Sequence, residues 1–152
     1  MTPHQKALFE EGALAATRAT SPERIEGIAA IVAEGITGEA AEAEDRRRLL
    51  QLVNELSEDE IVLLCDYTQR YGSDGAWSAK HAAVLEPVSS HMGSDRGTLD
   101  RELMRELRTA KLLRLGVLRE KPRPSGRGTS KDLSPLGRYV LRELNLIGED
   151  DF

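Results

Sequence analysis

Several features that mark secreted or metal-dependent proteins are scarce in this chain of 152 residues. A single cysteine, Cys65, excludes an internal disulfide and any metal site built from several cysteines. Three histidines, His4, His81 and His91, share no metal-ligand spacing, and no His-Glu-x-x-His motif occurs. No apolar run approaches the roughly 20 residues that span a bilayer. Aromatic residues make up only 4% of the chain, so we expect a core of Leu, Ile, Val and Ala.

The sequence also lacks the patterns of targeting segments and of common catalytic sites. Its start, MTPHQKALFEEG, has no basic region followed by an apolar segment, which is the pattern of a secretory signal. Cys65 lies in an apolar helical pattern, where a thiol behaves as a small hydrophobe. His91 and Asp95 could orient an imidazole, but no nucleophile is close in sequence. We therefore expect a cytoplasmic, non-catalytic protein with no cofactor, no metal and no membrane partner.

Helix-start signals recur through the first half of the chain. Pro3 follows Thr2 and Pro22 follows Ser21, and both prolines suit the first turn of a helix. Ser57 and Glu60 have the spacing of a capping box. The loop GSDGAW at 72–77 then suggests a boundary. These signals predict a helical bundle or oligomerisation part at 1–71 and a second domain at 72–152.

The stretch at 98–120 is the most informative part of the second domain. Apolar residues recur there at steps of three or four and predict one buried helical face, formed by Leu99, Leu103, Leu107, Ala110 and Leu113. Arginines are predicted on the opposite face, at Arg101, Arg105 and Arg108. Thr98 is the expected N-terminal cap, and Gly116 is expected to end the helix in a left-handed conformation.

The prolines and glycines of PRPSGRG, which follows this helix, exclude a helix and favour a short hairpin with a basic tip. Ser134 and Pro135 then start a last helix. A helix, a hairpin and a closing helix in this order are typical of a winged-helix domain. The predicted fold is therefore mainly α, with a helical N-terminal part followed by a winged-helix-like domain that carries a small β-hairpin.

Three segments carry a resemblance to a known group of proteins. They are RIEGIAAIVAEGIT, RRRLLQLVNELSEDEIVLL and KHAAVLEPVSSHMGS, in that order. Together they resemble a family of uncharacterised bacterial proteins with a helical N-terminal part and a winged-helix-like C-terminal domain. The resemblance covers roughly residues 20 to 146 and implies a link with abortive-infection, or phage-defence, proteins. It carries no catalytic residue over to this chain.

Charge separates along the sequence. The segment at 96–138 has twelve basic and five acidic residues, a net charge of +7, whereas the rest of the chain carries −12. Such a separation can steer a polyanion to one end of a molecule. We therefore expect binding to double-stranded DNA through the basic helix face and the wing. The candidate nucleic-acid-binding residues are Arg101, Arg105, Arg108, Arg119, Lys121, Arg123 and Arg127.

A protein-interaction module is the alternative, because the separated charges could equally attract two copies of the chain. The N-terminal helices have apolar stripes that predict a homo-oligomer, in the simplest case a homodimer formed through residues 20–70. In this alternative the winged-helix-like part is a docking surface that binds no nucleic acid.

Overall fold

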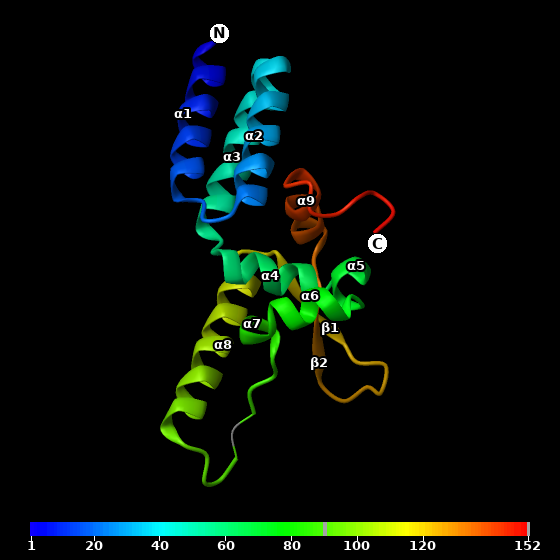
Figure 1. Cartoon of the computed structure of the whole chain (residues 1–152). Coiled ribbons are helices and arrows are strands. Elements are labelled where there is room, and N and C mark those ends of the chain that lie inside the picture. Colours follow the sequence, from blue (N-terminus) through cyan, green and yellow to red (C-terminus); the bar gives the residue numbers. More distant parts are fainter. Residues whose placement is uncertain (90, 152) are drawn as a thin grey trace. The chain divides into compact units, whose positions relative to one another are not determined.

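A computed structural model describes residues 1–89 and 91–151 of the chain (Figure 1). The described part is mainly helical, with a small antiparallel hairpin near the C-terminus, and this confirms the predicted fold class. Its contacts divide the chain into two compact units, Met1–Ile61 with Tyr139–Phe152 and Val62–Arg138. The functional assignment of 1–71 and 72–152 stays a prediction.

Unit 1 is built on three helices of equal length that lie side by side (Figure 1): α1 (Pro3–Arg18), α2 (Pro22–Thr37) and α3 (Ala40–Glu55). The predicted start signals are confirmed for α1 and α2, since Thr2 accepts a hydrogen bond from the Gln5 amide and Ser21 accepts one from the Arg24 amide. Helix α4 (Glu58–Asp66) follows the predicted capping box, in which Ser57 and Glu60 bond each other's amides.

The core of unit 1 is aliphatic, as the scarcity of aromatic residues predicts. Helices α2 and α3 pack against each other, and Ile28 and Ile31 of α2 and Leu50 and Val53 of α3 each expose 2% or less of their area. The end of α9 (Pro135–Glu143) adds Val140 and Leu141, and further buried residues come from Leu8, Ala15, Ala43, Leu49, Leu56, Leu144 and Ile147. The apolar stripes of α2 and α3 are thus largely covered inside this unit.

One charged side chain is inserted beside this core. Arg24 exposes only 10% of its side chain, and its Nη2 donates to the carbonyls of Val53 at 2.7 Å and Leu56 at 2.5 Å. These carbonyls belong to the C-terminal end of α3, where helical partners are missing. Burial lowers the pKa of Arg24, and the nearby carboxylates of Glu58 and Glu60 oppose that shift. Arg24 therefore acts as a side-chain cap of α3.

Unit 2 contains one long helix, α8 (Arg96–Arg114), and several short elements: α5 (Gln69–Gly72), α6 (Gly75–Lys80), α7 (Ala82–Leu85), β1 (Leu118–Pro122) and β2 (Thr129–Leu133). Its small core consists of Leu63, Leu64, Cys65, Leu112, Val117, Leu118 and Leu133. Asp74 caps α6 through the amides of Ala76 and Trp77. The unit has a smaller aliphatic core than unit 1.

The hairpin pairs β1 and β2 antiparallel, with Leu118 opposite Leu133 and Pro122 opposite Thr129. Gly116 ends α8 with a φ of 76°, which confirms the predicted left-handed stop. The start of α9 closes the hairpin, because the Ser134 hydroxyl donates to the Gly116 carbonyl at 2.5 Å. The backbone of Gly137 lies so close to the hairpin that a Cβ there would fall 2.2 Å from the Val117 carbonyl oxygen.

Within residues 1–89 and 91–151, no helix combines the length and the apolar character that crossing a membrane requires.

Candidate functional site

The predicted apolar stripe of α8 lies on the surface. Leu99, Leu103 and Leu107 expose 43%, 57% and 63% of their area, and Ala110 is exposed as well. Met104, on one border of the stripe, is 52% exposed. We call Leu99, Leu103, Leu107 and Ala110 the leucine face. Exposed apolar surface that is contiguous along a helix marks interaction sites in soluble proteins.

The prediction that this stripe is buried is therefore wrong for Leu99, Leu103, Leu107 and Ala110, whereas its fifth member, Leu113, is half-buried. The buried residue of α8 is Leu112, near the C-terminal end, where the Val117 amide bonds the Leu112 carbonyl. The polar connection at 86–95 has only Val88 and Met92 as large apolar side chains, and Met92 is fully exposed. Because the neighbouring connection has so little apolar surface, it does not cover the first turns of α8.

The start of α8 also differs from the prediction. The helix begins at Arg96 and its cap is Asp95, whose carboxylate accepts a hydrogen bond from the Thr98 amide at 2.8 Å. Hydrogen bonding from Thr98 lowers the pKa of Asp95. Asp95 is thus a helix cap, and the imidazole of His91 faces a different group, the Ser94 hydroxyl, at 3.1 Å. The His91 and Asp95 arrangement that could support acid–base chemistry does not form.

The three arginines of α8 that are predicted to bind DNA have different environments. Arg105 is half-buried, and its Nη1 donates to the carbonyls of Glu86 at 2.7 Å and Leu85 at 3.5 Å, at the end of α7. Arg101 is exposed and donates to the Thr98 hydroxyl at 3.3 Å, while Arg108 is partly exposed. Arg105 thus links α8 to α7, so the predicted arginine face lies partly against the unit's own chain.

The four wing residues lie on or next to the hairpin. Arg119 approaches Asp132 across the strands, with an Nη2 to Oδ2 distance of 3.4 Å. At the tip, Arg123 Nε donates to the Thr129 carbonyl at 3.1 Å, and the tip glycines Gly126 and Gly128 have φ values of 71° and 77°. Lys121 and Arg127 are exposed. The four basic side chains therefore lie together on one hairpin, and two of them, Arg119 and Arg123, have partners within it.

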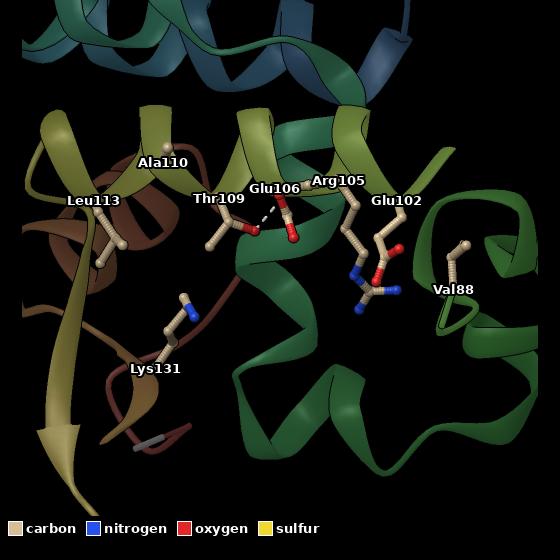
Figure 2. Close-up of a pocket in the computed structure, with 8 residues that line it drawn as sticks. All are labelled: Val88, Glu102, Arg105, Glu106, Thr109, Ala110, Leu113 and Lys131. Carbon is tan, nitrogen blue, oxygen red and sulfur yellow. Dashed lines mark hydrogen bonds between the residues drawn. The ribbon is translucent and has the colours of Figure 1, made fainter. Parts of the chain in front are cut away.

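An open cavity of about 350 Å³ lies beside the leucine face (Figure 2). Figure 2 shows side chains of α8 around it together with Val88 and Lys131, which come from the preceding connection and from β2. Its polar lining mixes two carboxylates, Glu102 and Glu106, with two cations, Arg105 and Lys131. The hydroxyl of Thr109, which also lines the cavity, donates to the Arg105 carbonyl at 3.0 Å. The lining contains no cysteine or histidine that would indicate nucleophilic chemistry.

Two other side chains of a reactive type, Cys65 and His81, are constrained by the residues packed around them. Cys65 is buried, and burial raises the pKa of its thiol to about 12, so the thiol is protonated at neutral pH. His81 packs against the ring of Trp77, with 4.9 Å between the ring centroids. Among the residues that the structure describes, no group of three or more His, Cys, Asp or Glu side chains could hold a metal ion.

Sequence reasoning missed Met104 and the accessibility of the leucine face. The available signal was the composition of the connection at 86–95, which offers little apolar surface to cover α8. Comparisons with protein-family models, with curated proteins and with solved structures gave no match.

Proposed function

We propose that this chain is a non-catalytic, cytoplasmic protein-interaction module that binds a protein partner through the leucine face of α8. One observation carries the proposal: three leucines and one alanine, with a methionine at their border, are exposed along a single 19-residue helix. Burial of apolar surface provides about 25 cal/mol per Å², so a partner that covers these side chains gains substantial free energy. A helix presented in this way fits the recognition of a helix face by an apolar surface of a partner.

The environment of α8 favours a protein over DNA as the ligand of this face. Protein–DNA interfaces are strongly basic and polar, because phosphate contacts supply much of the affinity. The leucine face offers no hydrogen-bond donors from its own side chains, and Arg101, Arg105 and Arg108 lie on the other side of the helix. Arg105 already uses its guanidinium within the unit.

Double-stranded DNA is a second candidate partner, supported by the exposed basic residues of the wing. Lys121 and Arg127 lie on the exposed hairpin, and the segment at 96–138 carries a net charge of +7. Binding to a labelled duplex in a salt series tests this candidate. If the wing holds phosphates, Lys121→Ala/Arg127→Ala lowers the log–log salt slope by about 0.9 for each phosphate that the variant no longer binds. Absence of binding at low salt would reject DNA as a partner.

Site-specific photo-crosslinking tests the main proposal. A photoreactive amino acid at position 103 should form a protein adduct in cells of the native host, whereas the same group at position 14 should form little. Leu14 is the matched control because it is 46% exposed on α1, outside the leucine face. Equal or absent adducts at both positions would contradict a protein-binding role for the face.

A further inference from the structure

A second cavity of unit 2, of about 270 Å³, lies between α8 and the chain at 83–88. Five residues of α8 line it: Asp100, Arg101, Met104, Arg105 and Arg108. At about 100° per residue, all five lie within roughly 70° of one line along the helix. That line is roughly 135° from the mid-line of the leucine face. A ligand of this cavity would therefore not cover the proposed protein-binding surface.

Three of these side chains carry guanidinium groups, at steps of four and three residues along α8. The position of Arg105 is fixed, because its Nη1 donates to the carbonyls of Glu86 at 2.7 Å and Leu85 at 3.5 Å. A guanidinium has five N–H donors on three nitrogens, and these bonds occupy one nitrogen. Like charges at such steps repel one another, and an anion between them relieves the repulsion. The arrangement favours an anion with two oxygens, which matches the planar fork of arginine.

Two carboxylates in the lining, Glu86 and Asp100, restrict the charge of that anion. With the three guanidinium groups, they leave the lining one net positive charge at neutral pH. A carboxylate monoanion neutralises this charge, whereas a phosphate group carries nearly two negative charges and would leave an excess. Along the helix axis, Asp100 is about 12 Å from Arg108. The end of the cavity at Arg105 and Arg108 is therefore the more favourable place for an anion.

The rest of the lining is apolar and consists of Ala83, Val84, Val88 and Met104. Val84 and Val88 are half-buried, and Met104 is 52% exposed. Ligand pockets typically combine such apolar walls with a few polar groups that fix the orientation of the ligand. The volume lies near the lower end of the range for such pockets, roughly 300–1,000 Å³, so the cavity suits a small molecule.

We propose that this cavity binds a small aliphatic monocarboxylate. Its carboxylate lies between the guanidinium groups of Arg105 and Arg108, which donate to the two oxygens. Its hydrocarbon chain lies against Val84, Val88 and Met104, where it leaves water. Both parts of the ligand contribute, so a molecule that lacks either the charge or the chain binds more weakly.

An NMR titration of the isotope-labelled full chain with hexanoate is the first test. We expect saturable shifts of the backbone amides at 83–88 and 100–108. Hexanoate should bind at least about tenfold more tightly than 1-hexanol, which lacks the charge, or acetate, which lacks the chain. Hexyl phosphate should also bind more weakly than hexanoate. Equal binding of hexanoate and hexanol, or no saturable shift at these amides, would overturn the proposal. These comparisons use the wild-type chain, so they do not depend on the folding of a variant.

Charge variants test the role of the lining. Arg108→Gln should weaken hexanoate binding about tenfold. Arg114→Gln is the matched control, because it removes one positive charge from α8 outside the cavity, and it should change the affinity less than about twofold. Asp100→Asn should strengthen binding about twofold to fivefold, since it removes a repelling carboxylate. Equal weakening by Arg108→Gln and Arg114→Gln would show that the general charge of the helix attracts the anion, and it would contradict a site at this cavity.

Discussion

Helix α8 and the three helices of unit 1 have the same kind of apolar periodicity but opposite exposure. In unit 1, Ile28, Leu50 and Val53 are almost completely buried because neighbouring helices supply matching apolar faces. In α8, Leu103 and Leu107 are more than half exposed, since the preceding connection is polar. The comparison teaches that periodicity identifies an apolar face, whereas burial depends on what the rest of the chain can place against it.

We expect the largest difference in the free energy of unfolding between substitutions of a buried leucine in unit 1 and of an exposed leucine on α8. Leu50→Ala should lower the free energy of unfolding by about 2–5 kcal/mol, because it leaves a cavity in a packed core. Leu107→Ala should change it by about 0.5 kcal/mol or less, since the side chain is 63% exposed. Urea denaturation at a concentration where the chain is monomeric measures both. Similar losses would mean that the two leucines have similar environments.

Two arginines that bind helix-end carbonyls sharpen the comparison between the units. Arg24→Ala should cost roughly 2–3 kcal/mol, because it removes two hydrogen bonds at a buried helix end and leaves the carbonyls of Val53 and Leu56 without this donor. Arg105→Ala should cost less than about 1 kcal/mol, since the Glu86 carbonyl lies at an exposed position where water replaces the donor. Thermal unfolding of the two variants side by side provides the measurement. A larger loss for Arg105→Ala would reverse the ranking.

Much of the local structure was predictable because it depends on neighbours in sequence. The prolines at the helix starts, the Ser57 and Glu60 capping box, the stop at Gly116 and the hairpin after it are all confirmed. The polar composition of the connection at 86–95 was a signal for the exposure of the leucine face. The contact of Arg105 with α7 was not predictable, because it depends on how an earlier segment folds back onto α8. The capping role of Asp95 was a nearer miss, because Asp95 and Thr98 are both good N-terminal caps.

The smallest expected effect concerns the exposed start of α8. Hydrogen bonding from Thr98 holds the pKa of Asp95 below its ordinary value in the folded chain. The ionised carboxylate therefore stabilises this turn above the unfolded pKa, near 3.9, and the contribution is lost as the pH falls through the folded pKa. Hydrogen exchange of the first α8 amides should accelerate in Asp95→Ala at neutral pH, after correction for the intrinsic rate. Ser89→Ala, on the exposed connection, is the control that should leave these rates unchanged.

The stability of Leu103→Asp/Leu107→Asp tests the central claim most directly. We would measure its free energy of unfolding by urea denaturation below the concentration at which the wild type associates, because association would add to wild-type stability. If the leucine face is a partner-binding surface, the free energy of unfolding of the monomeric variant should lie within about 1 kcal/mol of the wild-type value. A loss of several kcal/mol would show that these leucines belong to the core of the folded monomer, and it would contradict the account.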